Sequence, residues 1–277
     1  MGLEDNFGDI IGKARFGIGL TRTDVAASAR LSTDRVAALE GGMPPTPEEV
    51  LALAAPLGLD GDKLADIALW NWTPDAVQGK AVRRTVHRID GRIGDYPVNG
   101  YLLVDSRTRE AALFDTATRP DRVSTALKKA DATLVAICIT HAHADHISGV
   151  EAVHAATGAP IYIHPNEQKN PPGRVPIVTG MTIPVGRFQI RPLMTPGHTP
   201  GGVSFLVDLG ATAITFVGDA LFAGSLGRAA SPASYETLRM SVRRELLNLP
   251  GETVLFPGHG PATTVYQERR HNPFFLG

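Results

Sequence analysis

The sequence has little cysteine, few tryptophans and no long apolar run. Its single cysteine, Cys138, cannot form an intramolecular disulfide or a cysteine-rich zinc site. No apolar stretch approaches the roughly 18 residues that a membrane helix needs. The acidic start lacks the basic and apolar regions of a signal peptide. These absences exclude a disulfide-stapled secreted scaffold and a membrane-spanning chain, and they predict a soluble, cytoplasmic protein.

Charge and composition are close to those of an ordinary globular protein. The 277 residues include 27 Lys and Arg against 28 Asp and Glu, a formal net charge of -1. This balance gives no general electrostatic reason to bind nucleic acid or an anionic membrane. Hydrophobic residues make up 43% of the chain. That content and length predict a core domain of about 200 residues with a small additional part.

The small part is expected at the N-terminus, because residues 1–72 differ from the rest in charge and pattern. They contain 11 acidic and 6 basic residues, a net charge of -5, whereas residues 73–277 contain 17 acidic and 21 basic residues, a net charge of +4. Apolar residues recur at helical spacing in 23–29, 32–40 and 47–57, with Thr21 and Ser32 as N-caps. We therefore predict an all-α domain over residues 1–72, a boundary near residues 72–75, and a second domain over residues 73–277.

Part of this first domain has the pattern of a DNA-binding motif. The matching residues are Leu20-Thr21, Val25-Ala26, Arg30-Leu31-Ser32 and Leu39-Glu40. They resemble the helix-turn-helix of phage-repressor-like regulators, with Arg30 in place of the turn glycine. The second helix is poor in side chains that contact bases and phosphates, and a net charge of -5 repels the duplex. DNA binding is disfavoured but left open, and we favour formation of a homodimer or packing on the second domain, with Trp70 and Trp72 as candidate anchors.

The second domain is predicted to alternate strands with helices. Apolar and β-branched runs predict strands over 82–87, 101–105, 111–114, 133–140, 161–163, 188–194, 203–207, 213–217 and 253–256. Helical periodicity predicts helices over 121–130, 149–157 and 235–248. The run 133–140 is typical of a strand buried on both faces, which makes Cys138 an inert core residue. Residues 164–178, with four prolines, are expected as a surface loop or part of a lid.

Residues with metal-ligating side chains follow the C-terminal ends of these predicted strands. In sequence order they are His141, His143, Asp145, His146, His198, Asp219 and His259. The first four lie within six residues directly after the run 133–140. Three imidazoles and a carboxylate in so short a loop are typical of a site that holds cations. We therefore predict that the seven side chains bind metal together.

In order and spacing, these residues resemble the metallo-β-lactamase superfamily, over roughly residues 80–277. The resemblance implies a four-layer αβ/βα sandwich, in which two mixed sheets pack together with helices outside and the metals lie at one edge. It also implies a dinuclear site. The first metal would be held by His141, His143 and His198. The second would be held by Asp145, His146 and His259, with Asp219 bridging the two.

Two divalent cations at such a site would support hydrolysis. Cations about 3.5–4 Å apart can share a water, lower its pKa and hold the hydroxide opposite a bound carbonyl. Their charge also polarises the carbonyl and stabilises the tetrahedral oxyanion. Asp145 is expected to act in catalysis by orienting the water and managing its proton, in addition to binding metal. Zinc is favoured for imidazole and carboxylate ligands, and iron and manganese fit the same set.

Residues 218–228 and 256–274 resemble the short glyoxalase II-like hydrolases, which are thioesterases of the hydroxyacylglutathione hydrolase type. The resemblance implies a metal-dependent hydrolase that cleaves a small-molecule thioester. Two alternatives stay open. Persulfide dioxygenases resemble the same pattern, with a single iron held at the positions of His141, His198 and Asp219. A regulator of another class would combine DNA-binding helices with a metal domain that senses a metabolite.

Overall fold

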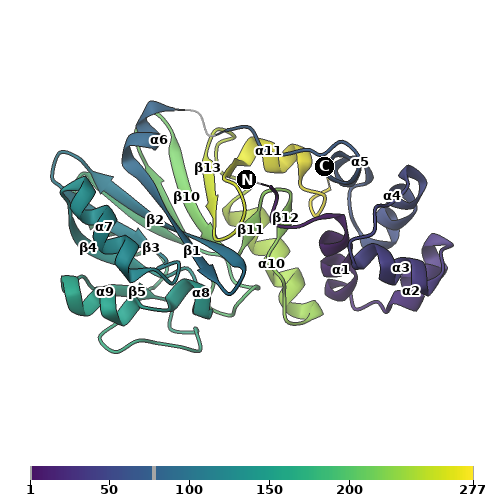
Figure 1. The fold of residues 1–277 in the computed structure, drawn as a ribbon, viewed down its shortest axis with the longest axis horizontal. Coiled ribbons are helices and arrows are strands. Elements are labelled where there is room, and N and C mark those ends of the chain that lie inside the picture. The colour runs from purple at the N-terminus through teal and green to yellow at the C-terminus, as the bar shows by residue number, and fades with distance from the viewer. Residues whose placement is uncertain (1, 77–78, 277) are drawn as a thin grey trace.

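The computed structural model describes residues 2–76 and 79–276, and its first part is helical (Figure 1). The helices are α1 (Phe7–Gly17), α2 (Arg22–Ala29), α3 (Thr33–Glu40), α4 (Pro47–Ala54), the 3₁₀ turn η1 (Ala55–Leu57) and α5 (Gly61–Ala68). Thr21 and Ser32 cap α2 and α3 as predicted, because their side chains accept backbone hydrogen bonds at the third residue of each helix. Arg30, which follows α2, has a φ of 57°, the left-handed conformation in which a helix-ending glycine is common.

The sequence-based prediction of elements needs correction at one strand, and it lacks several helices and short strands. The strand predicted over 82–87 is wrong, because residues Lys80–Thr85 form helix α6 and strand β1 (Val86–Ile93) begins only afterwards. Val82 and Thr85 are both buried, at the three-residue spacing of one helix face. Helices α1 and α5 are absent from the prediction, as are two shorter helices, Ala144–Ile147 and Val265–His271, and the short strands over 175–176, 183–185, 221–222, 225–226 and 263–264.

The first sheet has the strand order β1-β2-β3-β4-β5-β6. After β1 come β2 (Tyr96–Asp105), β3 (Glu110–Phe114), β4 (Thr133–Cys138), β5 (Ile161–Ile163) and β6 (Val175–Pro176). Strands β1 to β3 pair antiparallel, and β3 to β6 pair parallel. Helices α7 (Pro120–Ala130), α8 (Ala144–Ile147) and α9 (Val150–Thr157) connect these strands.

The second sheet has the strand order β14-β13-β10-β9-β8-β7. Its strands are β7 (Ile183–Val185), β8 (Phe188–Met194), β9 (Val203–Asp208), β10 (Ala213–Gly218), β13 (Val254–Pro257) and β14 (Thr263–Thr264). A small hairpin, β11 (Leu221–Phe222) and β12 (Ser225–Leu226), precedes α10 (Pro232–Glu245), and α11 (Val265–His271) follows β14. Strand β9 is antiparallel to both β8 and β10, and β10 is parallel to β13. Strands β8, β10 and β13 therefore end at the same edge.

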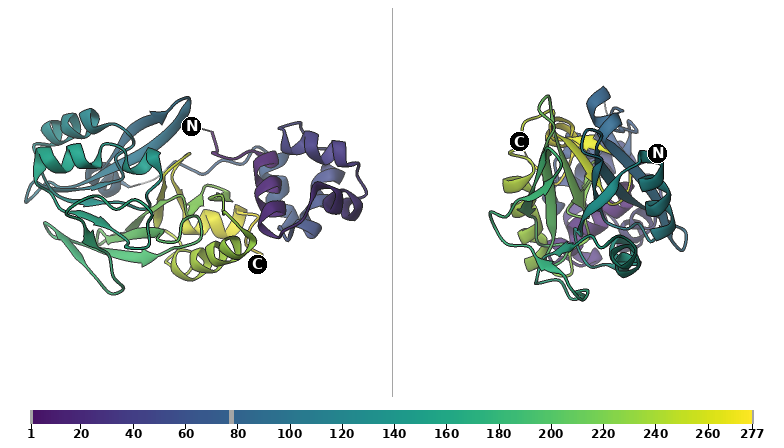
Figure 2. Two further views of the ribbon diagram at one scale, coloured as in Figure 1. Left: turned by 90° about the horizontal axis from the view of Figure 1, so that it is seen from below. Right: turned by 90° about the vertical axis from the view of Figure 1, so that its left-hand side faces the viewer.

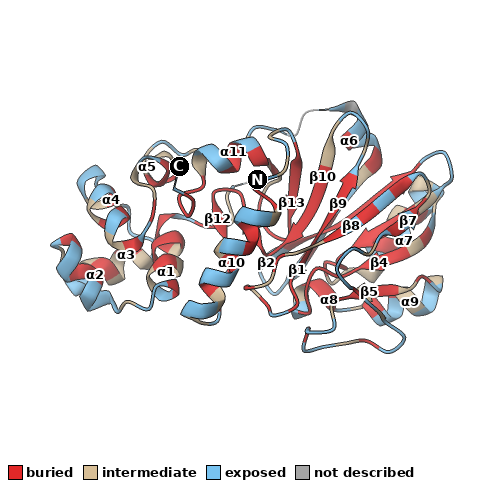
Figure 3. Cartoon of the chain, turned by 180° about the vertical axis from the view of Figure 1, so that it is seen from behind, coloured by how far each residue is buried: buried red, intermediate tan, exposed pale blue. Residues whose placement is uncertain are grey.

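Three apolar clusters hold the layers together, and the strands are largely buried (Figure 3). Between the sheets, Phe114 stacks on Phe216 with ring centroids 3.7 Å apart, and Cys138 is fully buried beside them. A second cluster joins the first sheet to α7 and α9, and the third lies under α10 and α11. The order helix, sheet, sheet, helix confirms the predicted αβ/βα sandwich. Within residues 2–76 and 79–276, no helix has the length and apolar character to cross a membrane.

The third cluster continues into the N-terminal helices, which lie against α10 and α11 (Figures 1 and 2). Polar contacts reinforce this junction: the Lys63 ammonium donates to the Phe275 carbonyl at 2.5 Å. Trp72 stacks on His271 with ring centroids 4.7 Å apart, so it does anchor the junction. Trp70 is 75% exposed, and the expectation that it is a second anchor is wrong.

Candidate metal centre

The seven predicted ligands meet at one edge of the sandwich, because each follows the end of a strand or lies in the short helix after one. His141 and His143 lie between β4 and α8, and Asp145 and His146 belong to α8. His198 lies in the loop after β8, Asp219 directly follows β10, and His259 comes shortly after β13. Since β8, β10 and β13 run in the same direction, their C-terminal ends bring residues distant in sequence together.

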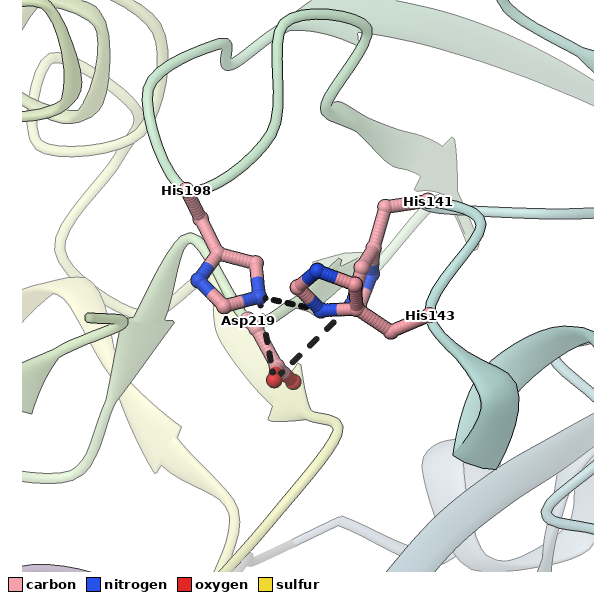
Figure 4. Close-up of side chains that lie close together, drawn as sticks. All are labelled: His141, His143, His198 and Asp219. Atoms are coloured by element: carbon pink, nitrogen blue, oxygen red, sulfur yellow. Dashed lines mark hydrogen bonds and ion pairs between the residues drawn. The ribbon is translucent and has the colours of Figure 1, made fainter. Parts of the chain in front are cut away.

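The side chains form two groups, and within each group the ligand atoms lie within 4.8 Å of one another. The first group is His141, His143, His198 and Asp219 (Figure 4), and the second is Asp145, His146 and His259. In the first group, His198 Nε2 lies 2.9 Å from His143 Nδ1 and 3.5 Å from Asp219 Oδ2. In the second, His259 Nε2 lies 3.1 Å from Asp145 Oδ2.

Asp219 contacts both groups. Its Oδ1 lies 3.3 Å from His146 Nε2, and its Oδ2 lies 3.5 Å from the Nε2 atoms of both His198 and His259. Asp219 is almost fully buried. This central location is the one that a bridging carboxylate between two cations requires.

Four of the five imidazoles are oriented by a hydrogen bond at the nitrogen that faces away from the cluster. His146 Nδ1 contacts Asp115 Oδ2 at 2.8 Å, and His141 Nδ1 contacts the Thr140 hydroxyl at 3.0 Å. His198 Nδ1 donates to the Arg228 carbonyl and His259 Nδ1 to the Pro97 carbonyl, each at 2.7 Å. A proton held at Nδ1 leaves Nε2 with a free lone pair directed at the cluster, which is the usual arrangement of histidines that bind metal.

Three inward-facing atoms are available to bind a cation. His141 Nε2, His146 Nε2 and Asp219 Oδ1 are buried and have no hydrogen-bond partner among the described residues. Leaving a buried polar atom unsatisfied costs about 1–3 kcal/mol, which a bound cation would offset. The backbone leaves room for this cluster at Gly258, where a Cβ would overlap Asp219 Oδ1 and His146 Cε1. The donor set of imidazole nitrogens and carboxylate oxygens suits zinc, iron and manganese.

Burial and charge act in opposite directions on the ionisable groups of the centre. Burial, reinforced by His146, lowers the pKa of His141 well below its usual range. For His146, burial is outweighed by the carboxylates of Asp219 and Asp115, which raise its pKa well above the usual range. Burial raises the pKa of Asp219, but His146 and the other imidazoles lower it further, so that the net pKa is well below the usual range. The cluster therefore favours the anionic form of Asp219, the form in which a carboxylate binds metal.

Asp115 is a supporting residue that the sequence analysis misses. It directly follows β3 with a φ of 54°, and its side chain is buried. Its Oδ1 accepts from the Thr140 backbone N–H, and its Oδ2 accepts from the Thr140 hydroxyl and faces His146, all at 2.8 Å. Asp115 therefore fixes both the start of the ligand loop and one ligand. The sequence does contain a signal for Asp115, because this residue directly follows an apolar strand, as Asp219 does.

Glu167 is a second supporting residue, and it connects two ligand loops. It is buried within 164–178, the segment expected as a surface loop or lid. Its Oε2 accepts from the Ala142 backbone N–H at 2.8 Å, between His141 and His143. Its Oε1 accepts from the Thr199 hydroxyl at 2.5 Å and from the Gly201 N–H at 3.0 Å, beside His198. No local sequence pattern marks this residue, because its role depends on two loops that are distant in sequence.

The fold and this ligand arrangement define a class, and comparison with known families agrees: the chain belongs to the metallo-β-lactamase superfamily. Residues 93–259, more than half of the chain, match the family described as "Metallo-beta-lactamase superfamily". The resemblance stated from the sequence is therefore confirmed for the second part of the chain. This match begins after the N-terminal helices and gives no support to their helix-turn-helix resemblance.

Individual relatives include a probable metallo-hydrolase, a hydroxyacylglutathione hydrolase and a di-iron-bound protein, and this chain covers most of the length of each. The probable metallo-hydrolase YqgX of Bacillus subtilis is 32% identical over 205 residues, which cover 67% of this chain and 95% of that protein. Hydroxyacylglutathione hydrolase GloC of Haemophilus influenzae is 30% identical over 187 residues, 60% of this chain and 87% of that one. TTHA1623, solved in a di-iron-bound form, superposes with a TM-score of 0.56 at 33% identity and covers 68% of this chain and 100% of that one. These relatives support a metal-dependent hydrolase, and they leave between about a third and two fifths of this chain unmatched.

Proposed function

We propose that the protein is a thioester hydrolase with a dinuclear zinc centre, and that its substrate resembles an acylated glutathione. The observation that carries the proposal is the pair of complete ligand groups that share Asp219. The similarity to the hydroxyacylglutathione hydrolase of Haemophilus influenzae supports the thioester class. Bound divalent cations would supply Lewis acidity, which acidifies a water and polarises the thioester carbonyl.

The protein's own residues would supply orientation and proton handling. Asp145 is the proposed catalytic residue, because its Oδ2 lies 3.1 Å from His259 Nε2 and 3.5 Å from His146 Nε2. Burial raises the pKa of Asp145, but the hydrogen bond to His259 and the charge of His146 lower it further, so the net pKa is below the usual range. The side chain is therefore a carboxylate at neutral pH, able to hold one hydrogen of the attacking water and orient its lone pair. Asp219, which contacts both ligand groups, would hold them at a fixed separation.

The test is a metal-defined assay on two substrate classes. Purified protein loaded with zinc, iron or manganese is given an acylated glutathione, with release of the thiol measured, and glutathione persulfide, with oxygen uptake measured. We expect thioester hydrolysis and no oxygen uptake. Oxygen uptake with iron alone, without thioester hydrolysis, would replace the proposal by a persulfide dioxygenase that uses His141, His198 and Asp219.

A variant of the shared carboxylate tests its role. Asp219→Ala should lower thioester turnover by at least about a thousandfold, because both ligand groups lose a member. Asp34→Ala, which removes an exposed carboxylate on α3, is the matched control and should keep full activity. Circular dichroism of both variants verifies the fold. Substantial turnover by a folded Asp219→Ala variant would refute the bridging role.

A further inference from the structure

The N-terminal part of the chain forms an open pocket that the matched family region does not contain. The pocket has a volume of about 590 Å³, within the range of small-molecule sites. Its walls are residues 3–8 before and at the start of α1, residues 42–45 between α3 and α4, and, at and after the end of α5, residues 67–68 and 71–73. All of these residues precede residue 93, where the family match begins. The pocket is thus a feature of the added segment.

The same N-terminal segment lies next to the metal centre. From Glu4, beside Gly260 after β13, the chain runs to α1 (Figure 1). Glu4 packs on Gly260, the residue after His259, so closely that a Cβ on this glycine would lie 3.1 Å from Glu4 N. Asp5 fixes the segment, because its carboxylate accepts from the Lys13 ammonium and, at 2.5 Å, from the Ser225 hydroxyl. Glu4 is therefore a wall of the pocket and a neighbour of a candidate metal ligand at once.

The Glu4 carboxylate lacks a direct cationic partner, although the charges of His259 and Lys13 act on it from nearby. It is about half-buried, and among the described residues its side chain has no hydrogen-bond donor and no ion-pair partner. Burial raises the pKa of Glu4, and the strongest opposing influence is the charge of His259. A partly buried carboxylate without a partner is unfavourable unless a ligand satisfies it.

The surroundings of Glu4 favour an organic cation. Trp72 and Met43 line the same pocket, and Tyr96, 61% exposed, lies edge-on to His259 with ring centroids 6.2 Å apart. Glu4 packs on Gly260 and Tyr96 on the preceding residue, His259, and the charge of Glu4 is the main cause that raises the pKa of Tyr96. Aromatic surfaces together with a carboxylate are the usual recognition site for an ammonium group.

We propose that Glu4 is a specificity-determining residue that binds an ammonium group of the substrate, with the adjacent pocket receiving the part remote from the thioester. The inference rests on the proposed thioester hydrolysis. Acylated glutathione carries such an ammonium group on its glutamyl part. The added N-terminal segment would thus select among thioesters rather than take part in the chemistry.

The test compares two thioesters of nearly equal shape that differ in one charge. They are acetylthiocholine and its uncharged carbon isostere, 3,3-dimethylbutyl thioacetate. Wild-type protein should prefer the cation in kcat/KM by about tenfold, the size of one partly desolvated charge contact. Glu4→Gln should bring this ratio close to one, chiefly through the KM for the cation. Asp34→Asn removes an exposed carboxylate and should leave the ratio unchanged. An unchanged ratio in Glu4→Gln, or an equal loss with both thioesters, would overturn the proposal.

A binding measurement separates this proposal from the proposed function. Choline and 3,3-dimethylbutanol, which have no thioester, are titrated into the protein and followed by NMR. Tighter binding of choline by the wild type, lost in Glu4→Gln, would support the role of Glu4 even if no thioester is hydrolysed. Equal affinities for the two compounds in the wild type would refute it even if thioesters are hydrolysed.

Discussion

Gly17→Ala tests how the N-terminal helices pack on the rest of the protein. Gly17 is the last residue of α1, and a Cβ there would overlap the ring carbons of Tyr235 in α10. Overpacking of this kind destabilises by about 1–3 kcal/mol, whereas alanine is favoured over glycine in a helix by up to about 1 kcal/mol. The net expectation is a loss of about 1–2 kcal/mol in the free energy of unfolding.

Gly12→Ala is the matched control in the same helix. A Cβ at Gly12 would meet carbon atoms of the Glu40 side chain at 3.8 Å, an ordinary contact. This substitution should therefore stabilise the protein by about 0.5–1 kcal/mol. Urea titration followed by tryptophan fluorescence measures both, because Trp72, one of the two tryptophans, is packed at the junction. In a Tyr235→Ala background, Gly17→Ala should lose its destabilising effect. Equal stabilisation by the two glycine substitutions would refute the packing of α1 on α10.

Three further predictions concern the supports of the metal centre, a buried acid and the N-terminal helices. Asp115→Asn should weaken metal binding by about 10–100-fold, measured by competition with a chelator, because it places an amide N–H against groups that donate to Asp115. Burial raises the pKa of Glu268 from 4.5 to about 7, so the folded state holds this proton more tightly than the unfolded state, and the contribution of Glu268 to stability falls as pH rises between these values. The free energy of unfolding of the wild type relative to Glu268→Gln should therefore fall by about 3 kcal/mol between pH 4 and pH 8, and a constant difference would contradict this. No salt-sensitive DNA binding should appear in a gel shift, because Arg35 and Arg22 are already paired with Glu49 and Glu40; a specifically competed shift would overturn this.

The helices that the sequence analysis misses show where local patterns are weak. Helix α1 has apolar residues at helical spacing, and Asn6 with Asp9 forms a capping box at its start. Three glycines, Gly8, Gly12 and Gly17, lower its intrinsic helix propensity and hide this pattern. Packing against α10 and α3 supplies the stability that the local sequence lacks. Gly8 illustrates this, since a Cβ there would overlap the Leu39 carbonyl oxygen.

The incorrect prediction of a strand over 82–87 has a different cause. A short run with Val82, Thr85 and Val86 suits either a strand or one turn of helix, and periodicity cannot separate the two at this length. The outcome depends on tertiary contacts, because Val82 packs in the cluster between the sheets. By contrast, the long apolar run 133–140 is predicted correctly as a buried strand. The strand itself ends at Cys138, two residues earlier than expected.

The ligand residues could be predicted because they follow strand ends, and parallel strands bring such positions together. The residues that hold these ligands in place could not be predicted. Glu167 is the clearest case, because it joins two loops that only the folded chain brings together. The same holds for Glu4, which precedes the matched region by almost ninety residues and yet packs on Gly260, the residue after His259. A residue whose partners come from distant segments leaves no periodic signal in the sequence.

Metal stoichiometry tests the central claim most directly. Elemental analysis of purified protein, saturated with zinc and freed of excess metal, should give close to two metal ions per chain. Asp219→Ala should lower this number, and Asp34→Ala should not, because only the former removes a carboxylate from the ligand groups. One tightly bound ion per wild-type chain, with His146 and His259 replaceable by alanine without loss of metal, would contradict the account.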